Sequence, residues 1–208
     1  VGKSSLFLFP FLIGGLCAII DVTAKGFVAG NDISRTMFGG AFLIGVAVAI
    51  AAYVTIYYRA LKFRRKVWVH AGYMLATPLI LFESPFGRIL NEFVPVFQIR
   101  GLEDLNRVMP AILFSMALEL AAIAAIWLRY RARATPFLVA GGFIIAQMLT
   151  MGLMAESALL KTILAAIGHV PSAIVVFTGF MIGAVTSWAG WKAGERPAVD
   201  TMRVAQPA

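Results

Sequence analysis

The sequence predicts an all-α membrane protein with six transmembrane helices, both termini cytoplasmic, and short interfacial helices in the outer loops. Composition is the first reason: 61% of the 208 residues are hydrophobic and 13% are charged. Soluble domains are about 45–50% apolar and about 25% charged. The other two reasons are the lengths of the apolar segments and the uneven distribution of Lys and Arg between them.

The apolar segments have the length that a bilayer requires, since a membrane-spanning helix needs about 20 mainly apolar residues. Six segments fit: residues 5–23, 38–58, 67–88, 109–129, 136–156 and 170–190. Each is expected to be helical, because backbone N–H and C=O groups in lipid must be satisfied within the segment. The first segment follows Lys3 like the apolar region of a signal peptide. However, Leu16 precedes Cys17, where a lipoprotein cleavage site needs a small residue, so we expect a retained helix.

The basic residues predict the orientation. With the N-terminus inside, the cytoplasmic segments hold twelve Lys and Arg residues and the opposite side holds six. The bias is strongest in the short loop 59–66, and short loops are where the positive-inside rule works best. We therefore predict one transmembrane domain, residues 1–191, and a polar, disordered cytoplasmic tail, residues 192–208. A bacterial inner membrane is the expected location.

Two outer loops are long enough to form short interfacial helices, at residues 89–108 and 157–169. The positions of Trp and Tyr agree with the predicted orientation, because these residues favour membrane interfaces and lie beside the predicted cytoplasmic loops. These residues are Tyr57, Tyr58, Trp68, Trp127, Tyr130, Trp188 and Trp191. A nucleic-acid partner is not expected, since the basic residues cluster between apolar runs and the lipid bilayer explains their placement.

Acidic residues near the outer side suggest a first candidate site. Asp21, Glu83 and Glu156 lie in the outer parts of three different predicted helices, and Arg88 follows Glu83. One interpretation is an interfacial ion pair, Glu83 with Arg88 or Arg88 with Glu92, which costs little at the headgroup region. The other is that the three carboxylates converge and attract a cation, a proton or a basic ligand.

Glu119 is the strongest candidate, because it lies ten residues into a predicted helix, near the bilayer midplane. A charge there costs about 2.5–3.5 kcal/mol, so the side chain must face the bundle, find partners or stay protonated. Gln147, Thr150 and Thr77 lie at similar depth. Hydrogen bonds among them would fasten helices together. The functional alternative is a proton or cation site, and it predicts that Glu119→Gln removes function but preserves folding.

The two histidines raise the possibility of haem, but His70 and His169 are predicted at opposite membrane faces. The hydrocarbon core of about 30 Å separates them, so one haem cannot bridge them. Neither ligand spacing for a metal nor a Walker or nucleophile motif is present. We therefore predict no cofactor, and His70 or His169 becomes a ligand only if haem is found.

Glycines indicate close packing of the last predicted helix, and a proline indicates a kink in the third. Gly179 and Gly183 have the G-x-x-x-G spacing, which predicts tight contact with a neighbouring helix or with a second copy of the chain. Pro78 predicts a kink in the third helix. Thr77, Glu83 and Ser84 recur 73 positions later as Thr150, Glu156 and Ser157, a pattern that either chance or an internal repeat explains.

Three functions remain open from the sequence; an enzymatic activity is not favoured, although the third function includes a redox enzyme. Transport of a small molecule or ion, coupled to protons or cations, or ligand binding within the bundle, is favoured by Glu119 and the outer acidic residues. A sensory or regulatory module would use the basic loop 59–66 to dock a cytoplasmic partner. A redox protein with haem or quinone has the least support, because paired ligands are absent.

Overall fold

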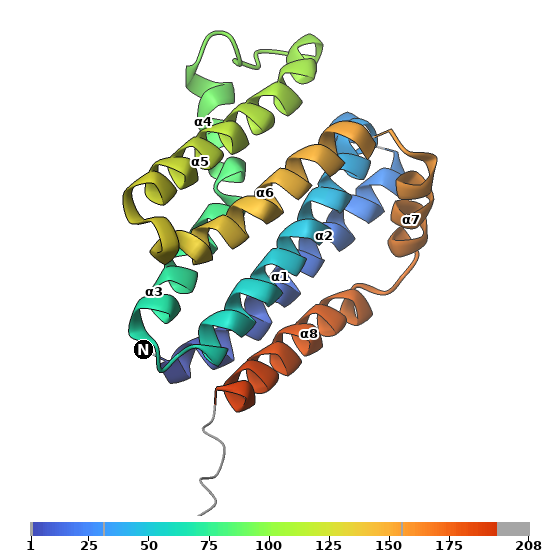
Figure 1. Ribbon diagram of the computed structural model, residues 1–208. Helices are drawn as coiled ribbons and strands as arrows, with labels where there is room; N and C mark the ends of the chain where they lie inside the picture. The colour runs from blue at the N-terminus through green and yellow to red at the C-terminus, as the bar shows by residue number, and fades with distance from the viewer. Residues whose placement is uncertain (1, 31, 155, 195–208) are drawn as a thin grey trace, which may run out of the picture.

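The computed structural model describes residues 2–30, 32–154 and 156–194, and all regular secondary structure in them is helical (Figure 1). The α-helices are α1 Gly2–Ala29, α2 Ile33–Lys62, α3 Val67–Ala76, α4 Glu83–Phe93, α5 Val108–Tyr130, α6 Thr135–Met154, α7 Ala158–Gly168 and α8 Ser172–Ala193. Three 3₁₀ segments join them: η1 Thr77–Leu81, η2 Leu102–Arg107 and η3 Arg131–Ala134. Helix α8 runs two residues past the predicted domain boundary at 191, and the rest of the predicted tail, 195–208, lies outside the described residues.

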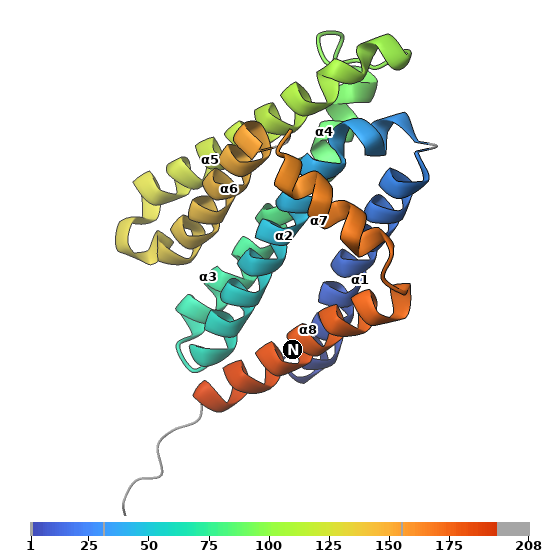
Figure 2. The ribbon, with the colours of Figure 1, turned by 90° about the vertical axis from the view of Figure 1, so that its right-hand side faces the viewer.

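Within the described residues, four helical stretches are long and apolar enough to cross a membrane: Ser4–Ala29, Ile33–Lys62, Leu102–Met154 and Ser172–Ala193. The third stretch has 53 residues and contains both α5 and α6. The chain turns back between them at Arg131, which has a positive φ of 49°, and the two helices then lie side by side (Figures 1 and 2). A membrane protein is therefore supported by length and composition.

The kink predicted at Pro78 is confirmed, and it is a full break: residues 67–88 form two α-helices joined by a 3₁₀ segment rather than one kinked helix. Helix α3 ends at Ala76, η1 covers Thr77–Leu81, and α4 starts at Glu83. Pro78 causes the break, because it has no N–H to donate to the preceding turn. The Thr77 hydroxyl donates instead to the Met74 carbonyl at 2.7 Å. The break places Glu83 in the first turn of a new helix.

Helix α2 is central and contacts α1, α3, α6 and α8. Helix α5 packs against α4 on one side and α6 on the other, and α7 lies across α1 and α2 (Figure 2). The largest buried cluster joins α1, α2, α3 and α6, with the rings of Phe9 and Tyr57 stacked at 3.9 Å between centroids. Helices α1 and α8 thus pack against α2, and the α4–α5 pair is joined to α2 through α6.

The G-x-x-x-G face of α8 packs against α1, within the chain. A Cβ atom on Gly179 would lie 2.5 Å from the Cys17 Sγ, and one on Gly183 would lie 2.6 Å from the Pro10 Cα. The glycines therefore serve the contact with a neighbouring helix that their spacing predicted. A contact with a second copy through the same two glycines would require α1 to move aside.

One end of the bundle, which we call the basic end, carries Arg59, Lys62, Arg64, Arg65, Lys66, Arg129, Arg131, Arg133 and Lys192. Side-chain contacts connect the segments that form this end. Arg64 Nη1 donates to the Trp191 carbonyl at 2.5 Å, and Arg133 lies over the Trp68 ring at 5.5 Å from its centroid. The described segments 59–76, 124–134 and 188–194 contain no Asp or Glu, so this positive charge is not balanced within them.

Candidate functional site

Three buried polar side chains from three helices meet in the bundle: Glu83 of α4, Glu119 of α5 and Gln147 of α6. Their exposed fractions are 6%, 3% and 3%. Gln147 Nε2 donates to Glu83 Oε1 at 3.3 Å. The carboxyl of Glu119 interacts electrostatically with that of Glu83 and lies near the backbone N–H of Glu83. We call these three residues the Glu83–Glu119 site.

The carboxyl oxygens of this site are poorly satisfied by the protein. Glu83 Oε2 and both oxygens of Glu119 have no hydrogen-bond partner among the described residues, and neither side chain forms an ion pair there. Burying a charge without a partner is expensive, and so is placing two like charges together. Protons or a bound cation would remove both costs, so the arrangement suits reversible binding of positive charge.

A cavity of about 480 Å³ adjoins the site, and Glu83 and Gln147 form part of its wall. The rest of its wall comes from α1, α2, η1, α4, α5 and α6. The residues are Leu16, Ile19, Thr23, Ser34, Arg35, Phe42, Gly45, Val46, Leu81, Ser84, Pro85, Gly87, Arg88, Asn91, Val108, Ile112 and Met151. These residues include the starts of α2 and α5 and the ends of α4 and α6, which are remote from the basic end (Figure 1). The volume falls within the range of about 300–1,000 Å³ that is usual for small-molecule sites.

Two arginines line this cavity and differ in their partners. Arg35 pairs with Asp32, with 3.0 Å between Nε and Oδ2. Asp32 caps α2, and the hydrogen bond from the Ser34 hydroxyl holds the pKa of its carboxyl below the usual value. Arg88 is exposed and forms no ion pair in the part of the chain that the structure describes. The predicted pairs of Arg88 with Glu83 or Glu92 are therefore not formed.

The two predicted threonines do not reach the site. The Thr77 hydroxyl donates to Met74, and the Thr150 hydroxyl donates to the Ala146 carbonyl at 2.8 Å. Each thus satisfies a carbonyl of its own chain segment, and neither lines the cavity. Ser115, one turn before Glu119, is fully buried and donates to the Ala111 carbonyl at 2.8 Å.

Asp21, Glu83 and Glu156 do not share one site, because Glu83 alone lines the cavity. Asp21 is buried and pairs with Lys25, with 2.9 Å between Oδ1 and Nζ. Lys25 also donates to the hydroxyl of Ser172 at the start of α8. Glu156 is exposed and pairs with Lys161 at 2.6 Å. The converging carboxylates are therefore Glu83 and Glu119, rather than Asp21, Glu83 and Glu156.

The Asp21–Lys25 pair is expected to stabilise the α1–α8 contact. Lys25→Gln leaves a buried carboxylate without its cation, and an unsatisfied buried group costs roughly 1–3 kcal/mol. We expect a lower midpoint of thermal unfolding in detergent, with most of the loss recovered in the double variant Asp21→Asn/Lys25→Gln. Equal midpoints for Lys25→Gln and the unsubstituted protein would contradict this role.

The two histidines lie in different parts of the molecule and do not share a site. His70 Nδ1 lies 2.8 Å from the Ala60 carbonyl, at the turn between α2 and α3. His169 is exposed and follows the last residue of α7. In the described part of the chain, no three His, Cys, Asp or Glu side chains are grouped as a metal site would need.

Sequence reasoning missed the cavity residues that lie outside the predicted helix centres, chiefly Arg35 and Asn91. Asn91 Oδ1 is buried without a hydrogen-bond partner among the described residues, and the side chain lines the cavity. Asn91 was placed in the outer loop 89–108 because the third predicted helix was expected to end at 88. The second proline, Pro85, was the available signal, because proline is tolerated in the first turn of a helix and so indicates a new start near 83.

No protein-family model, no curated protein and no solved structure matches this chain.

Proposed function

We propose that this chain is a multi-pass inner-membrane protein that transports a proton or a small monovalent cation through the Glu83–Glu119 site. The adjoining cavity would hold a small molecule whose movement is coupled to that cation. The single observation that carries the proposal is a pair of buried carboxyl groups without a basic partner among the described residues. Intramembrane ionisable residues that face a cavity are typical of ion and substrate pathways.

The proposed topology has six spans with both termini cytoplasmic. It counts α5 and α6 separately and treats α3, η1 and α4 as one broken span. The basic end would then face the cytoplasm, as the positive-inside rule favours, and the cavity would lie toward the outer side. A broken span beside the site fits this scheme, because irregular backbone within a membrane is tolerated where it lines a cavity. Helices η2 and α7 would be the interfacial helices of the outer loops.

Proteoliposomes test the function directly. The purified protein is reconstituted with a pH-sensitive dye inside, and a proton gradient is imposed with and without external Na⁺. We expect a dissipation of the gradient faster than in protein-free liposomes, with Na⁺ changing the rate if it competes for the same carboxyl groups. Rates equal to those of protein-free liposomes under both conditions would contradict transport of these ions.

A visible absorbance spectrum of the same preparation separates the proposal from the haem alternative. We expect no Soret band. A stoichiometric Soret band would instead make His70 or His169 an axial ligand and would replace transport with redox chemistry.

A further inference from the structure

We infer that a groove at the basic end binds one anionic phospholipid, with an acyl chain in the groove and the phosphate at Arg133. The groove has a volume of about 220 Å³ and lies between α3, α5, η3 and α6. It shares no lining residue with the cavity beside Glu83. The inference is therefore independent of the proposed function.

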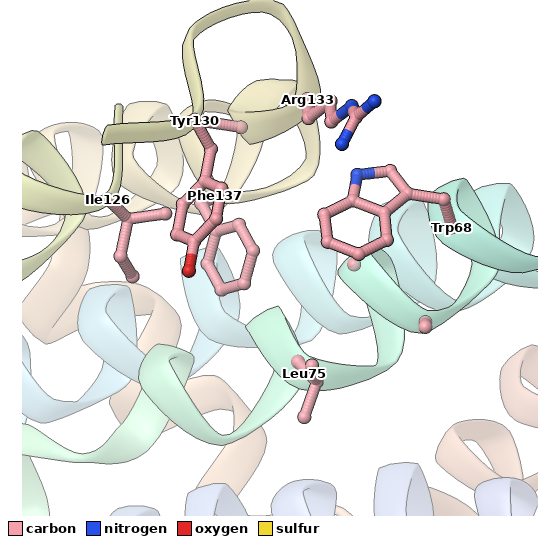
Figure 3. Close-up of a pocket in the computed structure, with 9 residues that line it drawn as sticks. Trp68, Leu75, Ile126, Tyr130, Arg133 and Phe137 are labelled. Carbon is pink, nitrogen blue, oxygen red and sulfur yellow. The ribbon is translucent and has the colours of Figure 1, made fainter. Parts of the chain in front are cut away.

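The lining of the groove suits a hydrocarbon chain. Figure 3 shows the side chains of Leu75, Ile126 and Phe137 around its interior, with Trp68 and Tyr130 on either side. Three further lining residues, Ala71, Gly72 and Ala134, are small and leave the space open. A Cβ atom on Gly72 would lie 2.9 Å from the Pro136 Cγ, so α3 packs closely against the start of α6 at this side of the groove.

The rim of the groove suits a phosphate. The guanidinium of Arg133 lies above the indole of Trp68, 5.5 Å from its centroid (Figure 3). Arg133 is exposed and forms no ion pair in the described residues. Its hydrogen-bond donors therefore remain open to an anion, while the contact with the ring restricts where the guanidinium lies.

Charge complementarity selects an anionic lipid over a neutral one. Arg129 and Arg131 shortly precede Arg133 in the sequence, and the described segments around the groove contain no carboxylate. Trp68 and Leu75 are 55% and 66% exposed, so the groove is open on its side, where a membrane helix meets acyl chains. A basic pocket between membrane helices with an apolar wall has the two features that anionic headgroups and their chains recognise.

Native mass spectrometry of the detergent-purified full chain tests the inference, with phosphatidylglycerol and phosphatidylcholine as probes. We expect one phosphatidylglycerol to bind in preference to phosphatidylcholine. Arg133→Gln should lower the affinity for phosphatidylglycerol about fivefold, the effect of one basic residue near an anionic headgroup. Arg65→Gln is the matched control, because it removes the same charge from an exposed position of the basic end outside the groove.

A second pair of variants tests the acyl-chain contact without changing charge. Ala71→Phe fills the groove, and Leu75→Asn makes an exposed part of its wall polar while leaving buried packing in place. Both should weaken phosphatidylglycerol binding with the unfolding midpoint of Leu75→Asn unchanged. Equal losses in Arg65→Gln and Arg133→Gln would show general charge attraction and overturn the inference, as would unchanged binding in Leu75→Asn.

Discussion

Glu119→Gln is expected to reduce cation flux in proteoliposomes to the rate of protein-free liposomes while the bundle stays folded. Glutamine has nearly the same shape as glutamate, so the packing of α5 against α4 is kept. It cannot bind and release a proton and it carries no negative charge for a cation. The unfolding midpoint should be equal or higher, because the variant no longer buries an ionisable group without a partner.

Two further variants test whether the loss of flux is specific to the buried carboxyl groups. Glu83→Gln should have the same effect on flux, since the two carboxyl groups act as one site. Glu156→Gln is the matched control: the side chain is exposed and pairs with Lys161, and the variant should keep the full rate. Full flux in Glu119→Gln would mean that Glu119 takes no part in transport and would contradict the proposed role of the Glu83–Glu119 site.

Gly183→Ala is expected to have the largest effect on stability. The added Cβ atom would lie 2.6 Å from the Cα and 3.1 Å from the N of Pro10. These are backbone atoms, so no side chain can rotate to make room and α1 and α8 must separate. Overpacking of a close contact typically costs about 1–3 kcal/mol, and we expect a value toward the upper end.

The matched control for Gly183→Ala is Gly15→Ala, because an added Cβ on Gly15, a helical glycine of α1, would meet no side chain and no neighbouring helix within 4 Å. This change should be neutral or slightly stabilising, since alanine favours a helix over glycine. Thermal unfolding in one detergent measures both. Equal midpoints in the two variants would contradict the close α1–α8 contact.

The sequence predicted where the helices lie better than what they contact. Hydropathy located the apolar segments, but α1 covers Gly2–Ala29 where 5–23 was expected, because the helix continues through polar residues beyond the bilayer length. The G-x-x-x-G spacing of α8 predicted a close neighbour without identifying it. Which helix contacts α8 depends on how all the helices pack together, and the spacing of two glycines carries no information about that packing.

The candidate site was predicted in part. The position of Glu119 at the middle of a predicted helix selected it, and Gln147 was suggested because it was predicted at a similar depth in the membrane. Pro78 predicted a kink within residues 67–88 but not the direction of the bend, so Glu83 was placed only in the outer part of that helix. The break at Pro78 turns Glu83 toward α5 and α6, and this long-range consequence of a kink has no signature in residue spacing. Asp21 and Glu156 were included for their similar depth, but each has a lysine nearby in sequence that pairs with it.

Labelling with a hydrophobic carbodiimide tests the central claim most directly, because this reagent enters membrane proteins and modifies protonated carboxyl groups there. The account predicts that peptide mass spectrometry finds modification at Glu119 or Glu83, that flux falls in proportion, and that high pH or Na⁺ slows the labelling. Modification confined to exposed carboxylates such as Glu92 and Glu156, with flux unchanged, would contradict a reversible proton or cation site in the bundle.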